Sequence, residues 1–259
     1  LPSGVSLFMQ PKLDGHRCIA HVTRSSVTLF SRKGEEITTM EHIKEDLLAI
    51  LKEVDLPHDL ILVDGEMFTH DTDFDGIASA VRGKKDKDGA EKARLSIQYF
   101  IYDAYVPSKP ELLYSERWDL INNHLGVGRA RTTGRGWSLR QVPTVACPEN
   151  VHEAVTAYAT ECVTDRYEGA MLRVNLPYEP GKRSKTLLKV KFFTDAEFEV
   201  VDALPGNGSH ADMAIFVCKM PDGKEFTVTA PGTHEEKKMY LAEKKLWIGK
   251  KLTVKYWPV

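Results

Sequence analysis

Segments with strand-like and helix-like hydrophobic patterns follow one another in an irregular order along this chain. Apolar residues alternate or run continuously, as in β-strands, at residues 6–10, 17–22, 27–31, 60–68, 95–105 and 169–174. Apolar residues have the spacing of amphipathic helices at residues 43–54, 74–82, 115–125 and 151–163. A regular βαβ array would alternate the two kinds strictly. The order therefore predicts an α+β fold.

The hydrophobic pattern changes after Phe193. Short strand-like runs then lie at residues 197–203, 213–220, 225–229 and 251–257, with one helical stretch at 234–245. We therefore predict two domains, residues 1–193 and 194–259. Several strands and one helix in about 65 residues are typical of an OB-type barrel, whose open face commonly holds nucleic acid. A generic small β-domain fits the same pattern.

The composition is that of a globular protein, with 42% hydrophobic and 28% charged residues in 259. No apolar run approaches the ~18 residues needed to span a bilayer, so we expect no membrane partner. The four cysteines lie far apart without a CxxC pair, which suits a reducing compartment inside a cell. Because position 1 is Leu, earlier removal of an export leader stays open.

The net charge of −2 is unevenly distributed. From Gly181 onward the chain has 14 Lys/Arg against 10 Asp/Glu, a net +4, which leaves −6 for the first 180 residues. An excess this small does not decide between a nucleic-acid partner and a solvated lysine-rich surface.

A lysine stands between two predicted strands, in the run KLDGHR at residues 12–17. A lysine amine is a poor nucleophile at its usual pKa of about 10.4, but burial or nearby cations activate it for covalent catalysis. Gly15 lets the backbone approach a phosphate or ribose closely. Taken alone, the run fits a simple turn better than a reactive site.

Carboxylates and further lysines occur at other strand ends. Glu66 lies in the DGE run at 64–66, and Glu168 directly precedes the strand at 169–174. In LLKVK at 187–191, the period of two directs Lys189 and Lys191 to one face, with Leu188 and Val190 on the other. A site that binds a polyphosphate needs carboxylates to hold Mg²⁺ and cationic side chains to neutralise the phosphate charge.

Six runs in this order resemble the nucleotidyltransferase motifs of ATP-dependent DNA ligases, especially the small viral, phage and bacterial ones. They are KLDGHR (12–17), SRKG (31–34), DGE (64–66), YFIYD (99–103), EGAM (168–171) and LLKVK (187–191). The resemblance covers nearly the whole chain. It implies an adenylation domain with antiparallel sheets and flanking helices, followed by an OB-fold domain, in a monomer that acts in DNA replication, repair or recombination.

The resemblance also implies a three-step reaction with ATP and Mg²⁺ or Mn²⁺. Lys12 attacks the α-phosphorus of ATP and carries AMP, the AMP passes to the 5′-phosphate of a nick in duplex DNA, and the 3′-hydroxyl then displaces it. Lys189 and Lys191 contact the α-phosphate, and Asp14 assists sealing. The implied metal ligands are Glu66, Glu168 and Asp14.

The resemblance further implies contacts to the base, ribose and phosphates. Tyr102 stacks on adenine, Met171 covers its other side, and the Gln10 amide reads the base edge. Arg17 and Arg32 grip ribose or phosphate, and Glu66 fits the ribose. Leu13 belongs to the nucleotide-binding set. Arg32 and Arg183 are expected to contact the nick 5′-phosphate. Arg117 is expected to form an ordinary helix ion pair.

The chain departs from the family pattern in its OB portion. It stops at residue 259, before the basic or proline-rich final motif, so this domain is predicted to lack its last segment. It also has only residues 206–212 where some viral ligases carry a long DNA latch.

Three alternatives stay open: a GMP-transferring mRNA-capping enzyme, an RNA ligase, and a nucleic-acid-binding OB protein with an inactive nucleotidyltransferase domain. Ser31, Arg32 and the LLKVK strand favour the DNA ligase over capping, and the intact Lys12 and Glu66 argue against an inactive site. NAD is disfavoured because only eleven residues precede Lys12.

Overall fold

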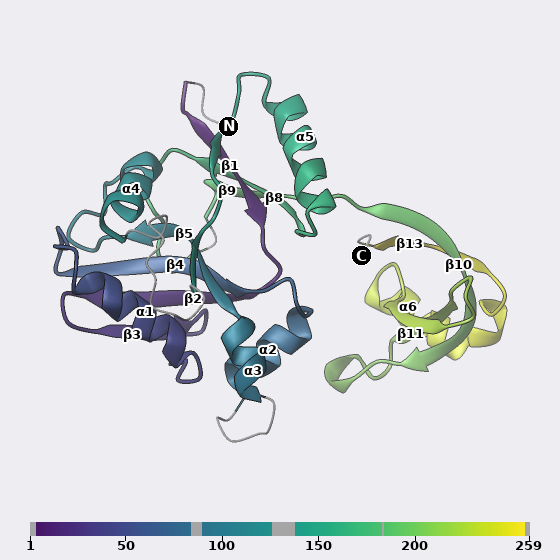
Figure 1. Ribbon diagram of the computed structural model, residues 1–259. Coiled ribbons are helices and arrows are strands. Elements are labelled where there is room, and N and C mark those ends of the chain that lie inside the picture. Colours follow the sequence, from purple (N-terminus) through teal and green to yellow (C-terminus); the bar gives the residue numbers. More distant parts are fainter. Residues whose placement is uncertain (1–3, 84–89, 126–137, 183, 257–259) are drawn as a thin grey trace. The chain divides into compact units, whose positions relative to one another are not determined.

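The computed structural model describes residues 4–83, 90–125, 138–182 and 184–256 (Figure 1). Contacts divide the chain into two compact units, Leu1–Lys191 and Phe192–Val259, and each is described by itself. Among the described residues, every helix is too short or too polar to cross a lipid bilayer.

A five-stranded sheet forms one half of the first unit, in the order β3-β2-β4-β5-β6. Neighbouring strands run antiparallel, except that β5 and β6 are parallel. In β2 and β3 every second residue is buried, which follows from the period of two along a strand. The strands are β2 (His16–Thr23), β3 (Val27–Ser31), β4 (Leu60–Phe68), β5 (Gln98–Tyr105) and β6 (Leu139–Gln141).

A four-stranded antiparallel sheet forms the other half, in the order β7-β1-β8-β9. Its strands are β1 (Leu7–Lys12), β7 (Val145–Ala146), β8 (Gly169–Val174) and β9 (Leu187–Val190). Helix α5 (Val151–Thr164) lies against this sheet, because Val155 shares a small apolar core with Leu7 and Leu172. The register pairs Lys12 with Gly169, so the end of β1 meets the start of β8.

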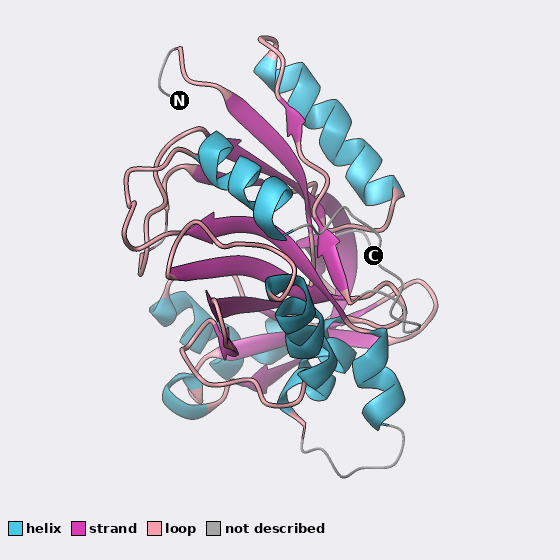
Figure 2. Ribbon diagram, turned by 60° about the vertical axis from the view of Figure 1, so that its left-hand side comes forward, coloured by secondary structure: helices cyan, strands magenta, loops and turns pink. Residues whose placement is uncertain are grey.

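Helices flank these sheets, as Figure 2 shows in cyan against the magenta strands. They are α1 (Glu41–Leu51), α2 (Phe74–Arg82), α3 (Ala90–Ser96), α4 (Tyr114–Leu120) and the π-helix η1 (Ile121–Leu125). Ile43 and Leu47 of α1 and Ile77 of α2 are buried in one core with the five-stranded sheet. Their spacing is the apolar stripe that the sequence predicts for these two helices.

The second unit contains one antiparallel sheet in the order β12-β11-β10-β13. Its elements are β10 (Thr194–Pro205), η2 (Gly208–His210), β11 (Ala214–Lys219), β12 (Glu225–Thr229), α6 (His234–Ala242), η3 (Lys244–Leu246) and β13 (Lys251–Tyr256). Helix α6 begins at a capping box, in which Thr233 and Glu236 each accept the other's backbone N–H. Between residues 192 and 256 the structure pairs four strands in one open sheet, whereas an OB fold has five strands in a partly open barrel.

The predicted elements agree with the structure most closely where the pattern is long and regular. Strands at 27–31, 60–68 and 169–174 and the helix at 74–82 have the predicted bounds. The strand predicted at 95–105 is too long, because its first two residues end helix α3. The sequence does not predict strands β6 and β7, because strands of three and two residues are too short to show an alternating hydrophobic pattern.

Candidate active site

Lys12, Glu168 and Lys191 form a compact ion cluster where three strands of the smaller sheet end. Glu168 directly precedes β8, and its backbone N–H donates to the carbonyl oxygen of Lys12 at 2.9 Å. One carboxylate oxygen of Glu168 pairs with the Lys12 ammonium and the other with the Lys191 ammonium. The three side chains are only 12–21% exposed. We call these residues the Glu168 cluster.

The backbone around the Glu168 cluster needs glycine at two positions. Gly169 has φ +143°, and a Cβ there would clash with the carbonyl oxygen of Val190 on the neighbouring strand. A Cβ at Gly15 would clash with the carbonyl oxygen of Met67. Both glycines therefore allow strands to approach closely beside the clustered charges.

Burial changes the protonation of the groups around Lys12. It lowers the pKa of the Lys12 ammonium, although the carboxylates of Glu66 and Asp14 oppose this. Burial also lowers the pKa of Lys191, with the positive charge of Lys12 acting in the same direction. Burial, assisted by the charge of Asp64, raises the pKa of Glu66 to about 8. A lysine with a lowered pKa is nearer to its nucleophilic neutral form than a solvated lysine.

Arg17 is held rigidly by Asp64 on the five-stranded sheet. The Arg17 Nε and Nη2 groups donate to the two carboxylate oxygens of Asp64 at 2.9 and 2.7 Å. The Tyr178 hydroxyl donates to Asp64 at 2.7 Å and accepts from Arg17 at 3.0 Å. The hydrogen bonds to Asp64 raise the pKa of Arg17, so the guanidinium stays charged and fixed in direction.

Tyr102 lies where the two sheets meet. Its hydroxyl donates to Glu66 at 3.4 Å, and the guanidinium of Arg173 lies 5.0 Å from its ring centroid. The Tyr102 carbonyl oxygen accepts hydrogen bonds at 3.3 Å from both the Gln10 amide and the Tyr114 hydroxyl. The ring and backbone of Tyr102 are thus fixed from several sides.

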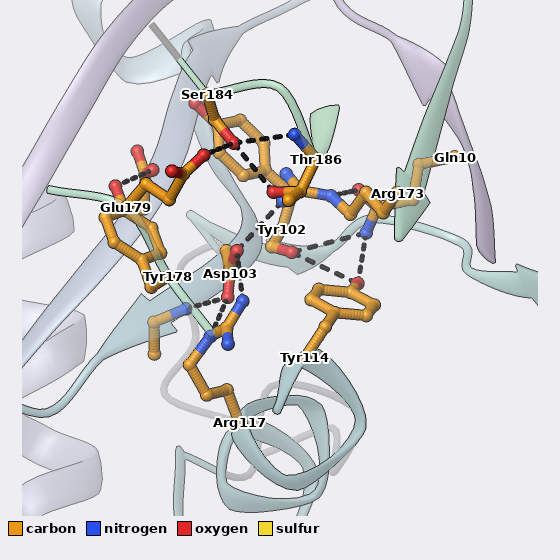
Figure 3. A network of polar contacts seen from close by, with 12 residues as sticks. Gln10, Tyr102, Asp103, Tyr114, Arg117, Arg173, Tyr178, Glu179, Ser184 and Thr186 are labelled. Atoms are coloured by element: carbon orange, nitrogen blue, oxygen red, sulfur yellow. Dashed lines mark hydrogen bonds and ion pairs between the residues drawn. The ribbon is translucent and has the colours of Figure 1, made fainter. Parts of the chain in front are cut away.

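A buried network lies next to Tyr102 (Figure 3). Asp103 on β5 accepts from Arg117 of α4 at 2.8 and 3.1 Å and from Arg173 of β8 at 2.9 Å. Arg173 Nε donates to the side-chain amide oxygen Oε1 of Gln10. The side chains of Asp103, Arg117 and Arg173 are only 3–8% exposed. We call these three residues the Asp103 cluster.

Two cavities meet at Arg17 and Arg32, which line both. The smaller, of about 280 Å³, is also lined by Asp64, Tyr102 and Tyr178. The larger, of about 910 Å³, extends from Glu66 along the loop after β3 to helix α2. Cationic side chains at the junction of two cavities favour an anionic ligand.

The structure brings some of the residues that the sequence singles out into contact with one another. Lys12, Glu168 and Lys191 are in direct contact, and Glu66 lies beside Tyr102. Asp14, Arg32 and Lys189 are exposed, and Met171 pairs in register with both Gln10 and Lys189. Leu188 is 39% exposed rather than packed. Arg183 lies outside the described residues.

Two predicted nucleotide contacts have unexpected surroundings. The side chain of Leu13 is buried in the core, so its predicted contact with a nucleotide is left to its backbone and stays a prediction. Gln10 is only 1% exposed. Its amide nitrogen lies 2.8 Å from the Tyr114 hydroxyl and 2.8 Å from the Thr144 hydroxyl. Its predicted reading of the base edge stays a prediction.

Sequence reasoning missed the Asp103 cluster and Tyr178. The expected helix ion pair of Arg117 is wrong, because its carboxylate partner is Asp103 on a neighbouring strand and the pair is buried. The available signal was Arg117 itself, because it stands at an inward-facing position of a short helix, and a buried arginine needs a partner.

No group of three or more His, Cys, Asp or Glu side chains gathers at metal-binding distance among the residues that the structure describes. Mg²⁺ typically binds proteins through one or two carboxylates together with substrate phosphates. The carboxylates beside Lys12, those of Glu66, Asp14 and Glu168, fit that donor set.

A strand-end lysine among acids and cations, set in two adjoining sheets and followed by a small β-unit, defines the nucleotidyltransferase class. Residues 3–191 match the ATP-dependent DNA ligase domain. The chain therefore belongs to this family, which confirms the resemblance and the α+β fold class.

Named relatives agree with this assignment. The DNA ligase of African swine fever virus (isolate Tick/South Africa/Pretoriuskop Pr4/1996) is 28% identical over 261 residues, 96% of this chain and 58% of the viral protein. The DNA ligase of Methanothermobacter thermautotrophicus is 28% identical over 211 residues, covering 78% of this chain and 35% of that protein. The chain thus spans less than two thirds of these relatives.

Solved structures show the same fold. A Lig E DNA ligase superposes with a TM-score of 0.73 at 20% identity, covering 98% of this chain and 86% of that one. The ATP-dependent ligase of bacteriophage T7, in complex with ATP, gives a TM-score of 0.58 at 15% identity, covering 98% and 87%. These neighbours support a nucleotidyltransferase unit followed by an OB-fold unit.

Proposed function

We propose that this protein is an ATP-dependent DNA ligase that seals nicks in duplex DNA through a covalent lysyl-AMP. The observation that carries the proposal is the Glu168 cluster, in which a half-buried lysine with a lowered pKa is held at a strand end. Membership of the ligase domain family supports the same chemistry for this chain.

In the first step, the Lys12 Nζ atom attacks the α-phosphorus of ATP. A P–N bond forms, the P–O bond to pyrophosphate breaks, and the amine loses a proton. Lys191 and Lys189 neutralise charge on the α-phosphate as the bond forms. Arg17, held by Asp64, grips the ribose or a phosphate from the five-stranded sheet.

The nucleotide lies between the two sheets in this proposal. Tyr102 stacks on adenine from one side, Met171 covers the other, and Gln10 reads the base edge. Of the carboxylates of Glu66, Glu168 and Asp14, one or two would hold Mg²⁺ or Mn²⁺ together with the phosphates, and the ion would neutralise phosphate charge. Separating a difficult condensation into activated steps is the general advantage of a covalent intermediate.

The remaining steps act on DNA. The 5′-phosphate of a nick displaces Lys12 from the AMP and becomes adenylated, and the 3′-hydroxyl then attacks that phosphate, forms the phosphodiester bond and releases AMP. Arg32 and Arg183 contact the 5′-phosphate, and Asp14 assists sealing. The protein acts as a monomer inside the cell, with residues 194–259 as the OB-fold domain.

The test is covalent labelling with ATP that carries label on the α-phosphate, followed by sealing of a nicked duplex with the same preparation. We expect labelled protein from ATP, loss of the label in Lys12→Ala, and sealed DNA. Lys109→Ala is the matched control, because Lys109 is an exposed lysine on a loop. Label from GTP alone would indicate capping chemistry, and sealing restricted to RNA ends would indicate an RNA ligase.

A further inference from the structure

The second unit has a cavity of its own, where the loop between β10 and β11 meets the start of helix α6 (Figure 1). Its volume of about 440 Å³ lies within the range of about 300–1,000 Å³ that is typical of small-molecule sites. Met213, Ala214 and Ile215 give it an apolar wall. Its polar lining consists of Asn207, His210, Thr229, His234 and Lys237. Among the described residues that line it none is acidic, so the cavity offers mainly hydrogen-bond donors and positive charge.

Hydrogen bonds within the loop hold one side of this cavity in place. The Gly206 backbone N–H donates to the Met213 carbonyl oxygen at 2.9 Å, and the Met213 N–H donates to the His210 carbonyl oxygen at 3.0 Å. A Cβ at Gly206 would clash with that same His210 oxygen, so glycine allows the loop to close tightly. The backbone that carries His210 is therefore fixed, and its ring centroid lies 5.8 Å from that of His234.

Lys237 is half-buried in this cavity, and none of the acids that the structure describes forms an ion pair with it. The nearby acids are engaged elsewhere. Asp212 pairs with Lys238 at 2.6 Å, and Glu236 accepts hydrogen bonds from the N–H and the hydroxyl of Thr233 at 2.7 and 2.9 Å. Because a charge that is partly removed from water is normally paired, this ammonium beside two imidazoles favours an anionic ligand.

We propose that this cavity binds the phosphate of a nucleotide, with Lys237, His210 and His234 as donors and the apolar wall against the sugar. In an OB fold the loop between the first two strands commonly contacts oligonucleotides, and the loop between β10 and β11 has that place in the second unit. The phosphate belongs either to the backbone of DNA or to a free mononucleotide, since both present the same charged oxygens. The site uses none of the residues of the proposed ligation reaction and thus goes beyond it.

The first measurement is binding of an intact fluorescent DNA duplex to the full chain, followed by anisotropy over a range of salt concentrations. If the phosphate belongs to DNA, Lys237→Gln should weaken binding about tenfold, because a charged hydrogen bond is lost. The slope of log Kd against log salt should also fall by about one, because one phosphate contact is lost. The matched control is Lys245→Gln, which removes the same charge from an exposed position outside the cavity and should change the affinity less than about twofold.

The second measurement follows the ring proton signals of His210 and His234 by NMR as inorganic phosphate or AMP is added to the wild type. If the phosphate belongs to a free nucleotide, both signals should shift with a Kd of about 1 mM or below, and Lys237→Gln should lose this shift. Either result supports the inference. Duplex binding that Lys237→Gln and Lys245→Gln affect equally, or not at all, together with no saturable shift of the two rings, overturns it. Neither measurement depends on labelling of Lys12, so the inference and the proposed function fail separately.

Discussion

The Glu168 cluster and the Asp103 cluster have the same charges but differ in exposure and in the kind of cation they contain. In each, one carboxylate binds two cations: Glu168 binds Lys12 and Lys191, and Asp103 binds Arg117 and Arg173. The lysines lie at strand ends with side chains 21% and 12% exposed, whereas the arginines are 4% and 8% exposed. Lysine can give up its proton when partly buried, and arginine stays charged with a rigid planar fork. The first cluster is therefore suited to reaction and the second to holding position.

The largest effect is expected when the reactive lysine becomes an arginine. Lys12→Arg keeps a cation beside Glu168 but replaces the amine with a guanidinium that does not lose its proton. We expect covalent labelling to fall by about 10⁴-fold or more, since the nucleophile is lost. Labelling with α-labelled ATP measures this, and the melting temperature should stay close to that of the wild type. Substantial labelling would mean that another residue carries the nucleotide.

The second prediction concerns stability and compares the two carboxylates. Asp103→Asn leaves two buried guanidiniums without a counter-charge, and breaking such a buried pair costs about 3–5 kcal/mol of unfolding free energy. Glu168→Gln should cost only about 1 kcal/mol, because its partners are closer to water. Urea denaturation of both variants measures the difference. Equal losses of unfolding free energy in the two variants would contradict the distinction between the Glu168 cluster and the Asp103 cluster.

The third prediction concerns the strand that positions Glu168. Gly169→Ala places a Cβ against the Val190 carbonyl oxygen at φ +143°. Strain of this kind costs about 1–3 kcal/mol, and it should also move Glu168 away from the two lysines and slow labelling. Gly181→Ala is the control, because its φ of +73° is also strained but a Cβ there would meet nothing within 4 Å. If both variants label equally slowly, the close approach at Gly169 has no role in the site.

The sequence predicted the Glu168 cluster better than the Asp103 cluster. Lys12, Glu66, Glu168 and Lys191 stand in short runs whose residue types already indicate phosphate chemistry, and the family assignment confirms the resemblance that those runs carried. Asp103 and Arg173 are 70 positions apart. Nothing local in the sequence pairs them, because an ion pair between two sheets depends on how the sheets pack. The same limit applies to β6 and β7, which exist only through pairing with distant strands.

The smallest effect is expected at Tyr178, which contacts both the Arg17–Asp64 pair and Arg117 of the Asp103 cluster. Its hydroxyl is hydrogen-bonded to Asp64 and Arg17, while its ring lies 5.6 Å from the Arg117 guanidinium. Tyr178→Phe keeps the ring contact and removes one hydroxyl, which should cost about 1 kcal/mol of stability. Because Asp64 still binds Arg17 through two hydrogen bonds, the KM for ATP should rise only about two- to threefold. Asp64→Asn is the stronger comparison, since it weakens both hydrogen bonds to Arg17, and its KM should rise further. A Tyr178→Phe variant as impaired as Asp64→Asn would show that the hydroxyl, and not the carboxylate, sets the direction of Arg17.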